Sequence, residues 1–291
     1  MVEFNVNQIL KKSDTAFLTT IFPSCMVFFD QFLKSLYLQT DKNFDLFIVN
    51  DGVVNFEKYF EEYKGINHIE IYSTNSIVEN RRIGIEAVKR LKYKYLIFGD
   101  SDDYFDSKRV FVSKQNLETF DIVVNDLNLF DSGGLYKEKF ISKRLKDATK
   151  VDLEFIKEKN IFGLTNTALR VKVIEKLDLC ENLIAFDWYF FSKLLYENKS
   201  AVFTNQTQTF YRQHKNNTVG LGDDSLESIK NAVRVKKIHY QCMAKISDYF
   251  DKILAETNLL EENIENVDFE IGKIKHTNLL WWETPYLIIN N

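Results

Sequence analysis

Several residue types that mark special classes of protein are scarce in this chain. Its 291 residues include 2 prolines, 10 glycines and 3 cysteines. Cys25, Cys180 and Cys242 lie far apart and form no CxxC pair, which argues against a disulfide framework or a structural zinc site and favours a reducing compartment. No run of about 18 apolar residues occurs, so the sequence predicts no transmembrane helix. The first residues lack the apolar core of a signal peptide, and we expect a cytoplasmic protein.

The chain also lacks an excess of positive charge. It has 38 Lys and Arg residues against 42 Asp and Glu residues, a formal net charge of −4. A protein whose main partner is nucleic acid usually carries a basic excess, so this class is disfavoured. Hydrophobic residues make up 45% and charged residues 27%, which is typical of a globular protein with an ordinary core.

The first hundred residues alternate between two hydrophobic patterns. Strand-like segments cover 15–22, 44–49, 68–72 and 95–98, and helix-like segments cover 29–38, 56–63 and 77–91. In the first helix, one face would carry Phe29, Phe32, Leu33, Leu36 and Tyr37. This alternation predicts an α/β fold with a mostly parallel central sheet flanked by helices. Ligands of such sheets bind beyond the carboxyl ends of the strands.

After residue 120 the pattern is less regular. We expect a strand over 121–130, a turn at Gly133-Gly134, a mobile lysine-rich loop over 137–150 and a helix over 186–196. Two further strands are expected near 201–204 and 209–212, and the chain beyond Gly222 has a helical pattern. We therefore expect an α/β domain over 1–220 and a C-terminal helical extension over 221–291.

Asp100, Ser101, Asp102 and Asp103 directly follow the strand 95–98. Carboxylates packed this closely repel one another unless a cation neutralises them. Oxygen ligands suit Mg²⁺ or Mn²⁺, which commonly bridge to a substrate diphosphate. A solvated acidic turn is the alternative. A calcium-binding EF-hand loop is excluded because Phe105 and Phe111 stand where that loop needs Gly and Glu.

Two charged residues near the second and third strands are further candidates. Asp51, in Asn50-Asp51-Gly52, could accept hydrogen bonds from a base or a ribose, or it could belong to a plain turn. Arg81 could pair with a phosphate, or it could be an ordinary surface residue.

Two segments in the second half of the chain also offer chemistry. Asp187 begins a helix, where the helix dipole favours an acid in any case, but it could also act as a general base beside Trp188. His214 follows Tyr211-Arg212-Gln213 and could be a metal ligand or a polar loop residue.

In their order along the chain, these segments resemble the family 2 glycosyltransferases, which have the GT-A fold. The likeness covers about residues 15–220, and its last segment is similar to bacterial rhamnosyltransferase-like members. The segments that carry it are Leu18–Phe22, Ser35–Thr40, Ile48–Val53, Arg81–Ala87, Asp100–Asp103, Gly163–Arg170, Phe186–Tyr189, and Tyr211–His214 with Asn217 and Gly220.

The resemblance implies an inverting, metal-dependent enzyme. It would move a hexose or deoxyhexose from a nucleoside-diphosphate sugar, with UDP or dTDP favoured over GDP, to a glycan or lipid-linked acceptor in bacterial surface polysaccharide synthesis. Mn²⁺ or Mg²⁺ would be held by Asp100, Asp102 and His214. The roles implied for the other residues are donor contacts from Thr20, Asp51, Arg81, Asp100 and Ser101, a general base at Asp187, and acceptor contacts from Trp188 and Asp103.

The sequence departs from the family at several positions. Asn50 replaces the first Asp of a pair, Val53 replaces Ser, Arg82 replaces Asn, and Phe22-Pro23-Ser24-Cys25 ends the first strand without the usual Tyr-Asn. A degenerate relative that binds a nucleotide sugar or a partner without catalysis is therefore the alternative. A sugar nucleotidyltransferase is disfavoured because Phe22–Asp30 contains no Gly, Lys or Arg.

The C-terminal segments Leu279–Trp282 and Tyr286–Ile289 are strongly apolar. Packing onto the domain or a homodimer interface would explain them. Contact with the inner face of the cell membrane is the alternative, to which the basic loop 137–150 could contribute.

Overall fold

The computed structural model describes residues 11–178, 180, 182–214, 225–264, 269–271, 279–283 and 287–289. The chain forms two compact units. Unit 1 comprises residues 1–151, 164–177 and 199–214, and unit 2 comprises 152–163, 178–198 and 215–291. Unit 1 is therefore interrupted twice by segments that belong to unit 2, which no composition change along the sequence indicates.

The core of unit 1 is a sheet that begins as the sequence predicts. Four parallel strands come from the first hundred residues and lie in the order β3-β2-β1-β4. They are β1 (Thr15–Ile21), β2 (Asp45–Asn50), β3 (His68–Tyr72) and β4 (Tyr95–Phe98). The four predicted strands agree with these bounds to within a residue at each end. In a parallel sheet the crossover connections place helices on both faces, and these helices cover the apolar side chains of the strands.

Helices pack on both faces of this part of the sheet. Side chains on a strand point alternately to opposite faces, and one face joins Phe17 of β1 to α1 (Met26–Tyr37) and η3 (Phe56–Glu61) in one hydrophobic cluster. The other face carries α2 (Ile77–Arg90), whose Gly84 lies against Leu18 and Val49. Of the predicted α1 face, four residues are buried, whereas Tyr37 is 45% exposed and its ring packs beside that of Tyr63.

The second half of the sheet mixes strand directions. Beyond β4 it continues as β9 (Thr167–Arg170), β6 (Ile122–Asp131), β10 (Ala201–Arg212) and β5 (Tyr104–Phe105). β9 is antiparallel to both of its neighbours, whereas β10 is parallel to β6. The two strands predicted near 201–212 are one strand, because an irregularity between Thr204 and Gln208 interrupts the pattern without ending the pairing.

Short elements complete unit 1. They are η2 (Pro23–Cys25), α3 (Arg109–Asn116), β7 (Gly134–Lys137), β8 (Lys150–Val151) and η4 (Val171–Val173).

The loop between β7 and β8 is irregular, as predicted, but it is anchored rather than free. Phe140 and Ile141 are fully buried. The carboxylate of Asp126, buried in β6, accepts hydrogen bonds from the N–H of Ile141 at 2.8 Å and from the N–H of Ser142 at 3.2 Å. The expectation of a mobile loop is therefore wrong, because buried contacts within unit 1 hold a segment that has no periodic pattern.

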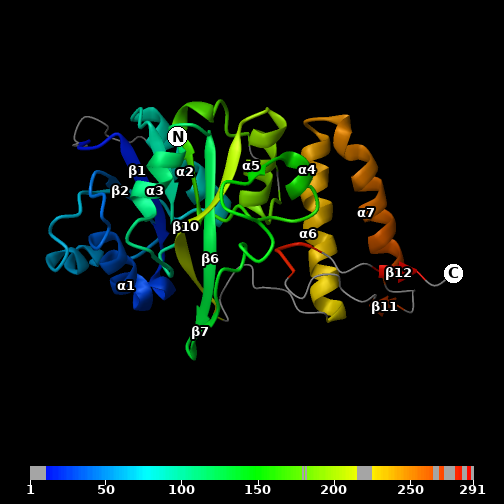
Figure 1. The fold of residues 1–291 in the computed structure, drawn as a ribbon, viewed down its shortest axis with the longest axis horizontal. Helices are drawn as coiled ribbons and strands as arrows, with labels where there is room; N and C mark the ends of the chain where they lie inside the picture. Colours follow the sequence, from blue (N-terminus) through cyan, green and yellow to red (C-terminus); the bar gives the residue numbers. More distant parts are fainter. Residues whose placement is uncertain are drawn as a thin grey trace. The chain divides into compact units, whose positions relative to one another are not determined.

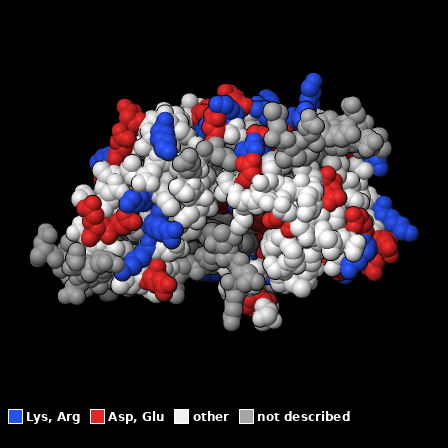
Figure 2. Space-filling model, turned by 180° about the vertical axis from the view of Figure 1, so that it is seen from behind, with Lys and Arg blue, Asp and Glu red and all other residues white. Residues whose placement is uncertain are grey.

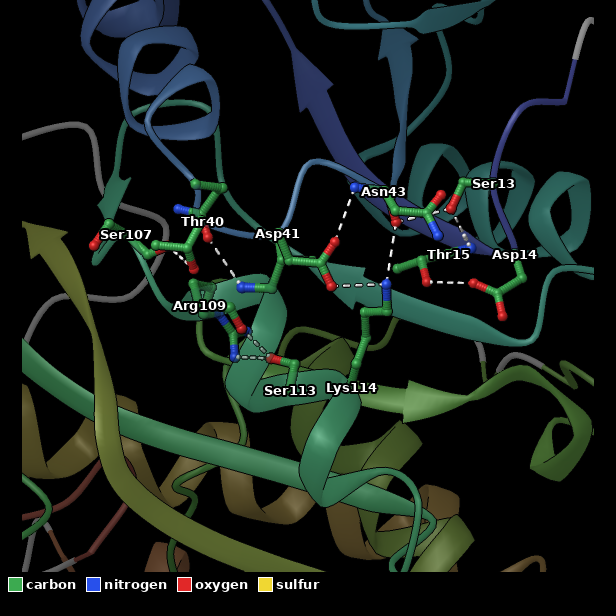
Figure 3. Close-up of polar contacts among 12 residues, drawn as sticks. Ser13, Asp14, Thr15, Thr40, Asp41, Asn43, Ser107, Arg109, Ser113 and Lys114 are labelled. Atoms are coloured by element: carbon green, nitrogen blue, oxygen red, sulfur yellow. Dashed lines mark hydrogen bonds and ion pairs between the residues drawn. The ribbon is translucent and has the colours of Figure 1, made fainter.

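Polar side chains satisfy one another near the amino-terminal ends of β1 and β2 (Figure 3). Lys114 forms an ion pair with Asp41 at 2.8 Å, and the hydroxyl of Ser13 donates to the carbonyl of Asn43 at 2.8 Å. The guanidinium of Arg109, which is fully buried, donates to the hydroxyl of Ser113 at 3.0 Å. These polar groups are therefore used in contacts within unit 1.

Unit 2 is mainly helical. Its helices are α4 (Leu153–Ile156), α5 (Phe186–Tyr196), α6 (Leu226–Ala244), η5 (Asp248–Phe250) and α7 (Asp251–Asn263). α6 and α7 lie side by side (Figure 1). The predicted helix over 186–196 is confirmed, and so is the helical pattern after Gly222 for α6 and α7. The prediction is wrong for β11 (Phe269–Ile271) and β12 (Leu287–Ile289), which pair as antiparallel strands.

A disulfide joins Cys180 to Cys242 across 62 residues of sequence. The argument that widely spaced cysteines disfavour a disulfide is therefore wrong, because the fold brings the segment before α5 next to α6. The expectation of a reducing compartment loses this support. Cys25 is free and buried.

Part of the apolar C-terminal sequence packs within unit 2. Leu280 is 2% exposed, and the N–H of Asn160 donates to the carbonyl of Trp281 at 2.9 Å. Tyr286 lies outside the described residues. In the described part of the chain, no helix has the length and apolar character needed to span a membrane.

Charged side chains of both signs are intermingled on the face drawn in Figure 2. This distribution agrees with the small net charge of −4. It gives no sign, on that face, of the extended basic surface that a nucleic-acid partner would require.

Candidate active site

Three of the predicted donor residues, Thr20, Asp51 and Asp100, lie at or just after the carboxyl ends of neighbouring strands, whereas Arg81 lies in α2. Ile21 of β1 is in register with Asn50 of β2, and Leu18 of β1 is in register with Phe98 of β4. The loops after these three strands therefore leave the sheet side by side. The hydroxyl of Ser101 donates to the carbonyl of Thr20 at 2.7 Å, which ties the Asp100–Asp103 loop to the end of β1.

Asp102 and His214 form a pair at this edge. Nε2 of His214 lies 2.9 Å from Oδ2 of Asp102, and their side chains are 23% and 19% exposed. The two residues are 112 positions apart in sequence, and β10 brings His214 back to the loop that follows β4. The structure thus joins two of the three residues for which the resemblance implies metal binding. The third, Asp100, is half-buried in the same loop.

Arg212 holds this pair in place. Its Nε donates to the carbonyl of Asp102 at 2.7 Å, and its guanidinium lies over the rings of Phe28 at 4.2 Å and Phe130 at 4.3 Å. Phe28 also stacks against the ring of His214, with 5.5 Å between the ring centroids. Hydrogen bonding and cation–π contact together restrict the guanidinium to one position. Sequence reasoning missed Phe28, because the helical pattern of α1 singles out only the buried face beside it.

Asp103 is 1% exposed, unlike its two acidic neighbours. Its carboxylate accepts hydrogen bonds from the N–H of Arg212 at 2.7 Å and from the hydroxyl of Thr165 at 2.5 Å. Burial, and then the charges of Asp102 and Asp100, hold the pKa of Asp103 well above its usual range. The side chain therefore joins three segments of unit 1 rather than lying open to a ligand.

Two neighbouring residues at the end of β2 differ in their contacts. The amide of Asn50 is used within the protein, and the carboxylate of Asp51 is available to a ligand. The side-chain amide of Asn50 donates to the carbonyl of Val53 at 2.9 Å, and its oxygen accepts from the N–H of Val53 at 2.8 Å. Gly52 follows with a φ of +82°, a conformation that glycine adopts without strain. The carboxylate of Asp51 has no hydrogen-bond partner among the described residues and is half-buried. Asn50 thus builds the turn that presents Asp51.

Arg81 and Arg82 also differ in their surroundings. Arg82 forms ion pairs with Glu79 and with Glu86, so its charge is used within α2. The guanidinium of Arg81 forms no ion pair or hydrogen bond with the residues that the structure describes. Of these two arginines, only Arg81 is therefore available to a ligand.

Asp187 and Trp188 belong to unit 2. One carboxylate oxygen of Asp187 accepts from the N–H of Trp188 at 2.8 Å, and the other accepts from the side-chain amide of Asn160 at 3.3 Å. Trp188 is fully buried, donates from Nε1 to the carbonyl of Ile156 at 2.8 Å, and stacks on His239 with 3.9 Å between the centroids. Its indole is part of the core of unit 2, which differs from the implied role as an acceptor contact.

The residues at the edge of unit 1 fit a divalent cation that a diphosphate helps to hold. Within the described ranges, no group of three or more His, Cys, Asp or Glu side chains is arranged to hold a metal ion by itself. Asp102 and His214 nevertheless place a carboxylate and an imidazole within 2.9 Å of each other. Mg²⁺ and similar ions are often bound by one or two protein ligands, with substrate phosphates and water completing the shell. The pair suits that arrangement. Asn217 and Gly220, which belong to the same sequence motif, lie outside the described residues.

Several solved structures that share this fold are glycosyltransferases. The chain is similar to residues 1–349 of TarS from S. aureus in complex with UDP-GlcNAc, with a TM-score of 0.59 and 15% identity over 86% of this chain and 72% of that one. It is similar to the mannosyltransferase PcManGT from Pyrobaculum calidifontis in complex with GDP-Man and Mn²⁺, with a TM-score of 0.56 and 9% identity over 86% and 70%. GalNAc-T7 with UDP, GalNAc and Mn²⁺ matches at a TM-score of 0.53 and 11% identity over 76% and 47%.

These likenesses confirm the predicted GT-A fold. No protein-family model matches the sequence, and no curated protein matches it. The narrower resemblance to family 2 and to rhamnosyltransferase-like members stays a prediction.

Proposed function

We propose that this protein is a glycosyltransferase that uses a nucleoside-diphosphate sugar. The observation that carries the proposal is the Asp102–His214 pair, which Arg212 holds at the carboxyl edge of a GT-A sheet. Support also comes from the ligands of structural neighbours, which include UDP-GlcNAc, GDP-Man and Mn²⁺. The chain would use a divalent cation, Mn²⁺ or Mg²⁺, and we favour UDP or dTDP over GDP as the donor nucleotide.

The available side chains suggest how the donor is held. Asp51 would accept hydrogen bonds from the base or the ribose, and Arg81 would pair with the base edge or a phosphate. Asp102 and His214, with Asp100 beside them, would hold the cation, which when bound supplies positive charge to the departing diphosphate. Ser101 and Thr20 would act indirectly, since the hydrogen bond between them ties the Asp100–Asp103 loop to the end of β1.

The transfer we propose is a single displacement with inversion. The acceptor hydroxyl attacks the anomeric carbon, the bond from that carbon to the diphosphate oxygen breaks, and the bonding electrons leave with the nucleoside diphosphate. Asp187 takes the hydroxyl proton as general base. The acceptor class that the sequence implies, a glycan or lipid-linked hydroxyl in bacterial surface polysaccharide synthesis, belongs to the same proposal.

Calorimetric titration with UDP, dTDP and GDP, each with Mn²⁺ and then with EDTA, tests the donor site. We expect one nucleotide to bind, and EDTA to abolish the binding. In Asp102→Asn the affinity should fall by about tenfold or more, because one anionic ligand of the cation is lost. Glu118→Gln removes an exposed carboxylate of the same unit and should leave binding unchanged.

Two outcomes would favour the alternative function, that of a degenerate relative without catalysis. If folded protein binds no nucleotide, the changes at Asn50 and Arg82 have disabled the donor site. If a nucleotide binds but no sugar is ever released or transferred, the chain is a non-catalytic binding protein.

Asp187→Asn tests the proposed base. Asn keeps an oxygen that can accept from the N–H of Trp188, so α5 should stay intact. The turnover rate should fall by about 10²- to 10⁴-fold, with nucleotide binding preserved. Asp178→Asn, an exposed carboxylate in the same unit, is the matched control. Normal turnover in Asp187→Asn would remove Asp187 from the mechanism.

A further inference from the structure

A cavity of about 600 Å³ that is open to solvent lies in the β7 hairpin and the loop that follows it, and it contains none of the predicted donor residues. Its lining comprises residues 135–139 together with 142 and 143. The volume is in the range of ordinary ligand sites. All of the lining belongs to unit 1, and most of it belongs to the basic loop 137–150, for which the sequence suggested only a contribution to membrane contact.

The charge of the lining is unbalanced. Lys137, Lys139 and Lys143 all contribute to it, against the single carboxylate of Glu138. None of the three ammonium groups forms an ion pair with a residue that the structure describes. Burial, and then the charge of Lys143, lower the pKa of Lys137, so these two cations are close enough to repel each other. An anion placed between them would relieve that repulsion.

The lysines stand on a scaffold that is built from buried polar groups. Asn128, 5% exposed in β6, accepts from the N–H of Lys139 at 2.9 Å. Asp126, fully buried in the same strand, accepts from the N–H of Ser142, which itself lines the cavity. Asn128 thus fixes the backbone at Lys139, and Asp126 fixes it at Ser142, which directly precedes Lys143. A site whose backbone is fixed before the ligand arrives loses less entropy on binding.

The strand order places the cavity near the candidate donor site. β7 pairs with β6, where Leu135 is in register with Phe130. On its other side β6 pairs with β10, where Phe130 is in register with Arg212, the residue that holds the Asp102–His214 pair. Neighbouring strands are about 4.8 Å apart, so β7 lies roughly 10 Å from β10. A molecule that reaches the transfer site could extend over this distance into the cavity.

The cavity also offers apolar and aromatic surface. Leu135 is 46% exposed and Tyr136 is 52% exposed. These side chains can cover the carbon skeleton next to an anionic group. Inorganic anions alone would not use them.

We propose that this cavity binds a phosphate group of the acceptor substrate, so that the enzyme extends a phosphate-bearing glycan. The acceptor role of this site rests on the proposed function, whereas the binding of an anion does not. The lysines would neutralise the phosphate, and Leu135 and Tyr136 would contact the adjoining sugar or polyol.

The test uses the full chain with Tyr136→Trp as a fluorescent reporter inside the cavity. The titrants are inorganic phosphate, glycerol phosphate, and vesicles of phosphatidylglycerol or phosphatidylcholine, at constant ionic strength without metal. We expect glycerol phosphate to bind more tightly than inorganic phosphate. The triple variant Lys137→Gln, Lys139→Gln, Lys143→Gln should weaken binding by at least about tenfold.

Lys34→Gln, Lys64→Gln, Lys172→Gln is the matched control, since it removes three exposed positive charges elsewhere in unit 1. Equal phosphate affinity in both triple variants would overturn the proposal. Binding to anionic vesicles without binding to glycerol phosphate would also overturn it, in favour of a lipid headgroup.

Calorimetry with nucleotide and Mn²⁺ on the same variants separates this proposal from the donor proposal. Both triple variants should keep the wild-type nucleotide affinity. Loss of nucleotide binding in every sample, with phosphate binding intact, would count against the proposed function and leave the anion site standing.

Discussion

His239 illustrates how burial sets the chemistry of a single residue. It is 2% exposed within unit 2 and stacked on Trp188. Its Nδ1 has no hydrogen-bond partner in the described structure. Burial, and then the nearby charge of Lys236, lower the pKa of His239 to about 3. The imidazole is thus a neutral core ring, not a candidate for acid–base chemistry near pH 7.

This burial predicts a pH dependence of stability. Because the folded pKa of about 3 lies below the ordinary 6.5, the unfolded chain takes up the proton first as the pH falls. His239 should therefore lower the free energy of unfolding by up to about 1.4 kcal/mol for each pH unit below 6.5. In His239→Phe, urea unfolding between about pH 7 and pH 5 should show a smaller loss. His68→Phe, at a half-buried site, should change the slope less; equal slopes in wild type and His239→Phe would contradict the argument.

The positioning role of Arg212 could not be predicted from the sequence. The motif Tyr211–His214 contains both Arg212 and His214, but it does not indicate that one orients the other. That assignment depends on Phe28 and Phe130, which approach the guanidinium from α1 and β6. Contacts between residues this far apart in sequence are properties of the folded chain, and no local pattern encodes them.

The packing of α2 depends on one glycine. A Cβ atom at Gly84 would lie 2.8 Å from Cδ1 of Leu18 and 2.9 Å from Cγ2 of Val49. Both distances are too short for carbon atoms, so either the side chains of Leu18 and Val49 or the helix itself would have to shift. The glycine sets how closely the element approaches the sheet.

Gly84→Ala should lower the free energy of unfolding by about 1–3 kcal/mol, because the added methyl overpacks a buried contact. Gly65→Ala is the control, since its new Cβ would meet the ring of Tyr37 at an ordinary 3.8 Å. Chemical denaturation of both variants provides the comparison. A stable Gly84→Ala protein would show that α2 can shift without cost.

Elements with a strong local period were predictable, and elements defined by pairing were not. The strands β1 to β4 and the helix α5 follow from continuous apolar runs or regular spacing. β5 and β8 have two residues each, so their identity as strands comes only from their partner β10. β11 and β12 follow a long helical pattern, which dominates the local signal.

At the scale of the whole molecule, the disulfide is a feature that was not predicted from the sequence. The pairing of Cys180 with Cys242 closes a loop with a sequence separation of 62. In the chain-entropy model, a disulfide that closes a loop of this length stabilises the folded state by up to about 4 kcal/mol. The effect should be confined to unit 2, because both cysteines belong to it.

Hydrogen exchange on the double variant Cys180→Ser, Cys242→Ser checks this expectation. The amides of α6 should lose protection, while those of β1 and β2 should keep it. Cys25→Ala, at the buried free cysteine of unit 1, should show the reverse pattern. Unchanged exchange in α6 would mean that packing alone holds this part of the unit.

The domain boundary near 220 stays a prediction. In the folded chain, contacts group residues 152–163 and 178–198 with the C-terminal part in unit 2. Segment membership depends on which contacts a loop makes after folding. By contrast, the edge of the sheet that carries Asp51 and Asp102 was predictable, because strand ends in a parallel sheet fall on one side.

The turn at Asn50 has a consequence for how this chain can change. Besides its contacts with Val53, the amide of Asn50 donates to Oε1 of Glu70 at 2.6 Å. Replacing Asn50 by Asp would remove that donor and set two carboxylates face to face. Asn50→Asp would therefore be destabilising unless Glu70 changed as well. The residue at position 70 thus restricts which substitutions position 50 can accept.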